Sequence, residues 1–100
     1  METTFTFRNM DTTEALRSHT LDKLDKLNKY LVKPGNAHII FNVEKFNHVA
    51  EITLMANGTR YVGIEHSTDM YASIDGAIRK LEDQLRKYKE RLKTHKGEAG

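Results

Sequence analysis

The clearest structural signal lies in residues 49–67, which have the sequence VAEITLMANGTRYVGIEHS. From Val49 to Ala56, one face of the expected strand carries the apolar side chains Ala50, Ile52, Leu54 and Ala56. The other face carries Glu51, Thr53 and Met55, so the pattern is that of a strand that buries one face. Asn57-Gly58 follows, and this pair favours a two-residue hairpin turn because both positions must accept a positive φ. Arg60 to Ser67 is then the returning strand. We therefore expect an antiparallel β-hairpin in this part of the chain.

Two more strands and a helix are predicted upstream of this hairpin. Residues 37–45 alternate around Ile39 and Phe41, and residues 3–8 alternate around Phe5 and Phe7. Between them, leucines and a threonine recur every three or four positions, as on the buried face of a helix: Leu16, Thr20, Leu24, Leu27 and Leu31.

The ends of this first helix are predicted from its flanking residues. Asp11 and Glu14 have the spacing of a capping box, in which the Asp11 carboxylate accepts an early backbone N–H and Glu14 reaches back. Pro34-Gly35 is expected to end the helix, since proline cannot continue it.

A second, longer helix is predicted after the hairpin. Ser67-Thr68-Asp69 offers N-caps, and Gly97 marks the expected end. We expect it to run unbroken from about Met70 to beyond Leu92. At 1.5 Å per residue it would span about 40 Å, so its last turns should project past the core. Its apolar stripe consists of Ile74, Ile78, Leu81, Leu85 and Leu92, with Ala77 and Tyr88 beside them.

The element order is therefore β-α-β-β-β-α, which is typical of a two-layer α+β domain. Strands joined by hairpins form a mostly antiparallel sheet, and the two apolar helix stripes need one face of that sheet to cover. A chain of 100 residues supports one domain, which we place at residues 1–96, with a short C-terminal tail at 97–100.

Positive charge is concentrated in the second helix. The net charge of the chain is only +2, but residues 70–96 contain eight Lys and Arg against four Asp and Glu. Such a gathering of charge on one element is typical of proteins that bind a polyanion. The alternative is a solvated helix whose cations form i,i+4 ion pairs along its surface.

The cations follow the flanks of the apolar stripes. On the second helix, Lys80, Lys87 and Arg91 share one flank, while Arg86, Lys89 and Lys93 share the other. On the first helix, Lys23, Lys26 and Lys29 are spaced three apart along one flank. If the helices pack side by side, their flanks combine into one basic surface suited to phosphate contact. We predict that Lys23, Lys26, Lys80 and Lys87 lie on one continuous exposed face.

No catalytic or metal-binding pattern is present in the sequence. The chain has no cysteine, its five histidines are scattered, and no serine has the glycine flanks of a nucleophile elbow. We therefore expect no enzymatic activity, no cofactor and no small-molecule substrate.

No apolar run approaches the roughly 18 residues of a membrane span, and METTFTFRN lacks the features of a signal peptide. The expected location is the cytoplasm.

Several segments together resemble the ribosome hibernation-promoting factors, a family also called ribosome-associated inhibitors or sigma-54 modulation proteins. The most specific match is Asp69-Met70-Tyr71-Ala72-Ser73-Ile74-Asp75, followed by Lys80-Leu81-Glu82, Gln84-Leu85 and Lys87. Weaker matches are Val43-Glu44-Lys45, Ala50-Glu51-Ile52-Thr53-Leu54, Ala15-Leu16-Arg17 and Lys26-Leu27. The resemblance covers nearly the whole chain, and the chain looks like a short form of the family.

The resemblance implies a fold like that of double-stranded-RNA-binding domains and a translation inhibitor as the function. A member of this family is expected to occupy the mRNA and A- and P-site tRNA path of the small ribosomal subunit. Its rRNA-binding positions correspond here to Lys23, Lys26, Lys29, Lys80, Lys87, Lys89, Arg91 and Lys93, and more loosely to Arg8. Asp83 departs from the arginine of many relatives. The alternative function is a protein-interaction module whose basic helix binds an acidic protein.

Overall fold

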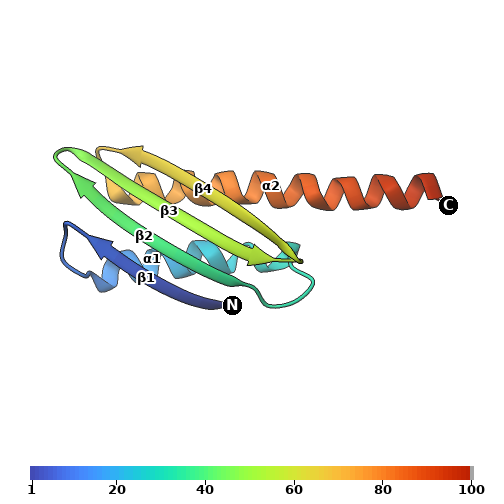
Figure 1. The fold of residues 1–100 in the computed structure, drawn as a ribbon, viewed down its shortest axis with the longest axis horizontal. Coiled ribbons are helices and arrows are strands. Elements are labelled where there is room, and N and C mark those ends of the chain that lie inside the picture. Colours follow the sequence, from blue (N-terminus) through green and yellow to red (C-terminus); the bar gives the residue numbers. More distant parts are fainter. Residues whose placement is uncertain (100) are drawn as a thin grey trace.

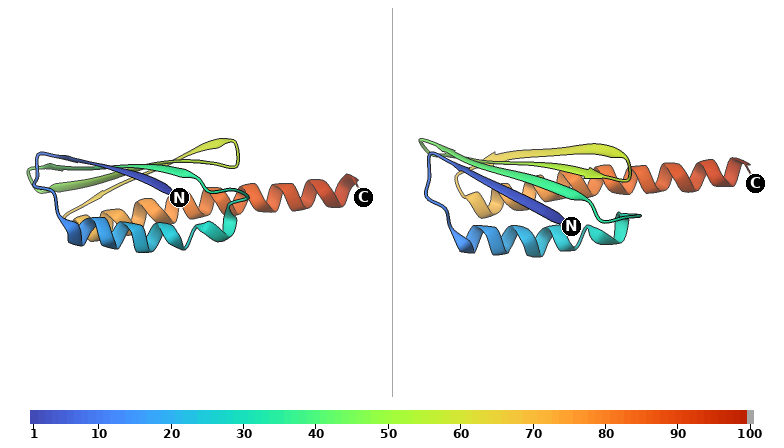
Figure 2. Two further views of the ribbon diagram at one scale, coloured as in Figure 1. Left: turned by 90° about the horizontal axis from the view of Figure 1, so that it is seen from below. Right: turned by 60° about the horizontal axis from the view of Figure 1, so that its bottom comes forward.

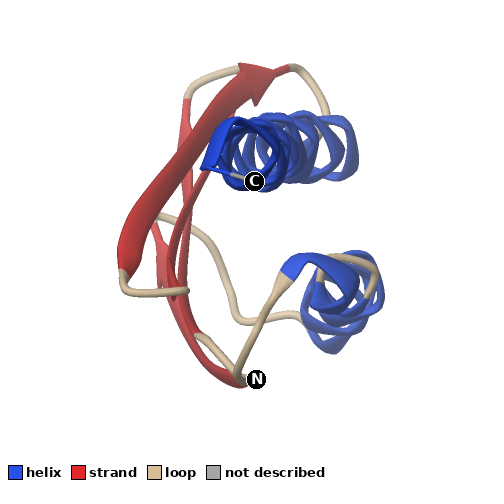
Figure 3. Ribbon diagram, turned by 90° about the vertical axis from the view of Figure 1, so that its right-hand side faces the viewer, coloured by secondary structure: helices blue, strands red, loops and turns tan. Residues whose placement is uncertain are grey.

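The computed structural model describes residues 1–99, and its side chains are described as far as Tyr88. A four-stranded sheet has the order β1-β2-β3-β4, with β1 parallel to β2 and the other neighbours antiparallel. Both helices lie on one face of this sheet, and the other face is open (Figures 2 and 3). The predicted two-layer α+β architecture is therefore confirmed. In chain order the elements are β1 (Glu2–Arg8), α1 (Glu14–Asp25), a 3-10 turn η1 (Asn28–Tyr30), β2 (Asn36–Glu44), β3 (Asn47–Ala56), β4 (Thr59–Ser67) and α2 (Met70–Ala99) (Figure 1).

The hairpin between β3 and β4 has the predicted two-residue turn. Ala56 pairs with Thr59, and Asn57 and Gly58 have φ values of 52° and 71°. Ile52 and Leu54 of β3 are fully buried, so this strand packs one face against the helices.

The first helix begins and ends differently from the prediction. Its N-cap is Thr13 and not Asp11, because Thr13 has an extended backbone and its hydroxyl accepts a hydrogen bond from the Leu16 N–H at 3.0 Å. Glu14 pairs with Arg17 at 3.3 Å instead of reaching back. The predicted capping box is therefore wrong, and the helix begins at Glu14, directly after its Thr13 cap.

The helix α1 ends before the predicted Pro34-Gly35, and a tertiary contact holds the following segment in a non-helical course. The helix stops at Asp25, and Leu31 is already extended. Asn57, in the β3–β4 turn, accepts a hydrogen bond from the Val32 N–H at 2.8 Å and donates one to the Tyr30 carbonyl at 3.1 Å. These bonds fix the backbone near residue 31 in a non-helical course, so the helix does not continue to Pro34-Gly35.

The cap at Thr13 is expected to contribute measurably to stability. Thr13→Ala should lower the free energy of unfolding by about 1 kcal/mol, because the Leu16 N–H loses its acceptor. Urea denaturation checks this value. Thr12→Ala is the matched control, since Thr12 is exposed and lies outside the helix. Equal effects of the two substitutions would contradict Thr13 as the cap.

The second helix is continuous over 30 residues and projects well beyond the end of the sheet, as predicted (Figure 1). It reaches Ala99, so the expected end at Gly97 is wrong. Gly63 of β4 permits the close approach of this helix, since a Cβ there would lie 2.3 Å from the Ala77 carbonyl oxygen. The helix therefore packs backbone to backbone on its strand.

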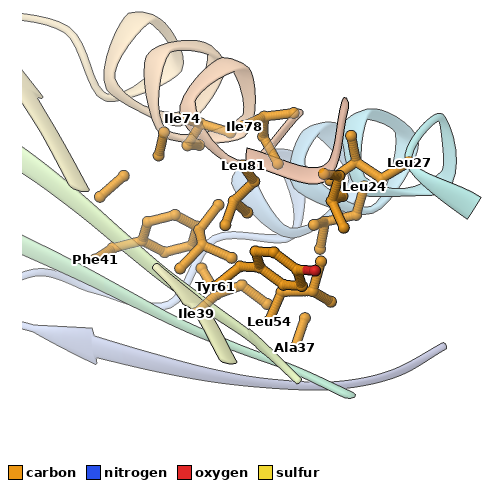
Figure 4. Close-up of a cluster of buried hydrophobic side chains, with 14 of the residues drawn as sticks. Leu24, Leu27, Ala37, Ile39, Phe41, Leu54, Tyr61, Ile74, Ile78 and Leu81 are labelled. Carbon is orange, nitrogen blue, oxygen red and sulfur yellow. The ribbon is translucent and has the colours of Figure 1, made fainter. Parts of the chain in front are cut away.

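The core lies between the sheet and the two helices (Figure 4). Ile39 and Phe41 of β2 project from the sheet towards Leu24 of α1 and Leu81 of α2, and all four are buried. No helix in the described part of the chain is long and apolar enough to cross a membrane.

Candidate nucleic-acid interface

A groove lies between α1 and α2, and most of the residues that line it are charged. It has a volume of about 210 Å³. We call it the interhelical groove. Its lining residues are Lys23, Lys26, Leu27, Asp75, Ile78, Arg79 and Glu82.

Specific contacts hold the two walls of the groove together. At one end, His19 Nε2 lies 2.7 Å from Asp75 Oδ1, and the imidazole meets the Tyr71 ring edge-on at 5.0 Å between ring centroids. At the other end, the Tyr30 hydroxyl donates to Glu82 Oε2 at 3.2 Å. Arg86 lies 3.5 Å from the other oxygen of Glu82. Both carboxylates of the groove therefore already have partners.

The remaining cations of the groove are unneutralised by ion pairs. Among the described residues, Lys23, Lys26 and Arg79 have no carboxylate oxygen within 4.0 Å. Hydrogen bonding to Tyr30, together with the charge of Glu82, raises the pKa of Arg86, so this guanidinium at the end of the groove stays charged. The groove thus has three cations against two carboxylates, which is an excess of positive charge for an incoming anion.

The opposite flank of α2 lies over β4 and not beside α1. Lys80 Nζ donates to the Ile64 carbonyl at 2.6 Å and lies 3.5 Å from Glu65 Oε2. The His66 N–H and the Lys80 ammonium lower the pKa of Glu65. Gln84 Nε2 donates to the Val62 carbonyl at 2.8 Å. Lys80 is therefore engaged with the edge of the sheet.

The prediction that Lys23, Lys26, Lys80 and Lys87 share one face is therefore wrong. Lys87 borders a separate cleft with Arg60 and Tyr61, on the same side of α2 as Lys80. The helices meet through the flank of α2 that carries Asp75 and Ile78, so the Lys80 flank faces away from α1. Spacing along α2 defines two flanks but does not tell which of them receives α1.

The structure places the other predicted site residues as follows. Lys29 is exposed and its ammonium lies 5.3 Å from the centre of the Tyr30 ring. Arg8 and Asp83 are exposed. The side chains of Lys89, Arg91 and Lys93 lie outside the described residues. Arg79 was not among the predicted site residues. The sequence could have indicated it only through its position on the same face of the helix as Asp75 and Glu82, one turn from each.

Lys80 is bonded to the edge of the sheet and Lys87 has no such bond among the described residues, and this difference leads to a prediction about stability. Lys80→Glu should lower the free energy of unfolding by about 1 kcal/mol, because the Ile64 carbonyl loses a charged donor and a second carboxylate is placed beside Glu65. Lys87→Glu is the matched control and should stay within about 0.5 kcal/mol of wild type. Chemical denaturation of both variants makes the comparison. An unperturbed Lys80→Glu protein would mean that the bond to Ile64 contributes little.

Comparison with known proteins identifies the family of this chain. The family model for sigma 54 modulation protein / S30EA ribosomal protein matches residues 3–93. The chain is 38% identical to the ribosome hibernation promoting factor of Salmonella typhimurium, with coverage of 95% of this chain and 100% of the relative. It is 39% identical to that of Escherichia coli K12, with the same coverage.

Two solved structures are similar over most of the chain. The N-terminal domain of Protein Y from Thermus thermophilus has a TM-score of 0.82 at 27% identity, covering 88% of this chain and 99% of that domain. A ribosomal subunit interface protein from Coxiella burnetii has a TM-score of 0.78 at 32% identity, covering 90% and 99%. With a family model that spans most of the sequence and relatives that align along their whole length, the chain belongs to the sigma 54 modulation protein / S30EA ribosomal protein family.

Proposed function

We propose that this chain is a cytoplasmic hibernation factor that binds the small ribosomal subunit and inhibits translation. In this proposal the domain occupies the path of the mRNA and of the A- and P-site tRNAs, and it blocks them sterically without bond-making chemistry. Relatives that match nearly the whole chain are named ribosome hibernation promoting factors, which supports this class of function. The observation that carries the proposal is the excess of positive charge in the interhelical groove, whose lining has three cations against two carboxylates.

The chemistry of the groove suits phosphate groups of rRNA. Lys23, Lys26 and Arg79 outnumber Asp75 and Glu82 among the residues that line the groove, so the groove has an excess of positive charge. Phosphate contacts reward positive charge and position a protein without reading base sequence. An RNA backbone that follows the groove would replace the solvent around Lys23, Lys26 and Arg79 with ion pairs. The proposed rRNA contacts are therefore Lys23, Lys26 and Arg79, with Lys29, Lys87, Lys89, Arg91 and Lys93 around them.

Lys80 is expected to contribute less to rRNA binding than the sequence alone predicts. Its ammonium already donates to Ile64 and lies near Glu65, so an rRNA phosphate would have to compete with these partners. Lys87 has no carboxylate oxygen within 4.0 Å among the described residues, and its side chain is exposed. We therefore expect Lys87 to contribute more to ribosome binding than Lys80.

Sedimentation with purified ribosomal subunits tests the proposal. The protein should travel with the small subunit at low salt and remain near the top of a gradient that contains only the large subunit. Raising the salt should release it, because phosphate contacts lose affinity steeply with ionic strength. Digestion of the rRNA should also release it. A complex that survives complete digestion would favour the alternative, an acidic protein partner, and no co-sedimentation at any salt would exclude ribosome binding.

A further inference from the structure

The two edges of the sheet differ in how their free backbone groups are satisfied. On the β4 edge, side chains of α2 bond to the outward carbonyls: Lys80 to that of Ile64 and Gln84 to that of Val62. An edge strand whose polar groups are occupied in this manner does not accept another strand. The β4 edge is therefore closed to strand pairing.

The β1 edge is open. The Glu2 N–H donates to the Gly35 carbonyl at 3.0 Å, so the even-numbered residues of this parallel strand direct their backbone groups towards β2. The backbone groups of Thr3, Phe5 and Phe7 consequently point away from the sheet. None of the described side chains hydrogen-bonds to them. Figure 3 shows β1, which carries the N-terminus, along one rim of the sheet, with α1 under the sheet and no element beyond the rim.

We propose that β1 pairs with β1 of a second copy of this chain, antiparallel about Phe5, to form a continuous eight-stranded sheet. In this register Phe5 lies opposite Phe5, and Thr3 lies opposite Phe7. These are the three residues with outward backbone groups, so each facing pair exchanges two N–H···O=C bonds. The pairing is two-fold symmetric, as expected of an interface between identical chains.

Charge selects this register over its neighbours. Glu2 of one copy lies opposite Arg8 of the other, at both ends of the paired strands, and both side chains are exposed. Both also lie on the open face of the sheet, where directly opposite residues attract if their charges differ. A shift by two residues in either direction places Glu2 against Thr6 or Arg8 against Thr4 and loses both ion pairs. The pairing ends naturally after Arg8, since Asn9 has a φ of 57° and turns the chain away.

The sequence of β1 also lacks the features that usually prevent an edge strand from pairing. Natural edge strands are commonly protected by a central charge, a proline or a bulge, and β1 has none of these between Thr3 and Phe7. Phe5 and Phe7 are only partly buried, although the Arg17 guanidinium lies over them at 5.0 and 5.9 Å from the ring centres. A second copy of β1 would cover apolar ring surface that the monomer leaves exposed.

A charge-swap series tests the proposed pair. Analytical ultracentrifugation of the full chain over a concentration series should show a reversible monomer–dimer equilibrium. Glu2→Lys or Arg8→Glu alone should raise the dimer Kd at least tenfold, because each turns two attractive pairs into two repulsive ones. The double variant Glu2→Lys/Arg8→Glu should return to within about threefold of wild type. All variants should have the same melting temperature as wild type, since both side chains are exposed. A monomeric wild type at millimolar concentration, or a double variant as weak as the single ones, would overturn the proposal.

Cysteine crosslinking tests the register directly, because the chain has no cysteine of its own. Thr4 of one copy lies opposite Thr6 of the other in a pair without mutual hydrogen bonds, where Cα atoms are about 4.5 Å apart and a disulfide fits. An oxidised mixture of Thr4→Cys and Thr6→Cys chains should therefore form a crosslinked heterodimer. Either variant alone should crosslink at least tenfold more slowly. Equal crosslinking by Thr4→Cys alone would show a different register and contradict the proposed interface.

Discussion

Reversing the charge of Lys23 and Lys26 together should weaken binding to the small ribosomal subunit by at least tenfold. Both side chains line the interhelical groove, and neither has a carboxylate within 4.0 Å among the described residues. The substitution removes two phosphate contacts and adds repulsion next to Asp75 and Glu82. Each lost contact also flattens the slope of log K against log salt by roughly 0.7 to 0.9. A salt-series titration of Lys23→Glu/Lys26→Glu measures both effects.

A control of equal charge separates a local effect from a general one. Lys33→Glu/Lys45→Glu changes the net charge by the same amount at two exposed positions that line neither the groove nor the cleft of Lys87. This variant should keep affinity within about threefold of wild type and a similar salt slope. Thermal melts of both variants establish that each is folded. If the control lost as much affinity as the groove variant, binding would depend on overall charge and not on the groove.

The largest effect on stability is expected at Phe41. This side chain is 0% exposed and its ring packs against those of Phe5 and Phe7 at 6.0 and 5.2 Å between centroids. Phe41→Ala removes a ring from the middle of the core and leaves a cavity, which costs about 4 kcal/mol. Because small domains are stable by only about 5–15 kcal/mol, the variant should lose roughly a quarter or more of its free energy of unfolding.

Phe46 provides a matched control, because it is 86% exposed in the turn between β2 and β3. Phe46→Ala should change the free energy of unfolding by less than about 0.5 kcal/mol. Urea denaturation followed by circular dichroism compares the two variants. A small loss at Phe41 would show that the aromatic cluster is not a main source of core stability.

The elements that were predicted correctly depend on local signals. Asn57-Gly58 specifies its turn through the positive φ that both residues adopt, and this requirement is independent of the rest of the chain. The apolar stripe of α2 is likewise a local pattern, and Ile74, Leu81 and Leu85 are all buried as expected. Strong local patterns of this kind determine the type and order of the elements.

The errors depend on contacts between distant parts of the chain. The chain stays non-helical around residue 31 because Asn57 bonds to the backbone 25 and 27 positions before it, and no spacing within the helix reveals this contact. The flank of α2 that meets α1 is the one that carries Asp75, which bonds to His19 of α1. These two residues are 56 positions apart, so the contact is not visible in the sequence. The composition of the basic groove, including Arg79, therefore required the tertiary structure.

The strand order has a consequence for the folding of newly made chains. The β2–β3 and β3–β4 pairings each close a loop of two residues, whereas the β1–β2 pairing brings together residues such as Thr4 and His38, 34 positions apart. Short loops close first because chain closure costs more entropy as the loop lengthens. During synthesis β1 leaves the ribosome first, but it has no partner until residues 36–44 have emerged. Of the four strands, β1 closes the longest loop when it pairs, so we expect it to be the last to join the sheet.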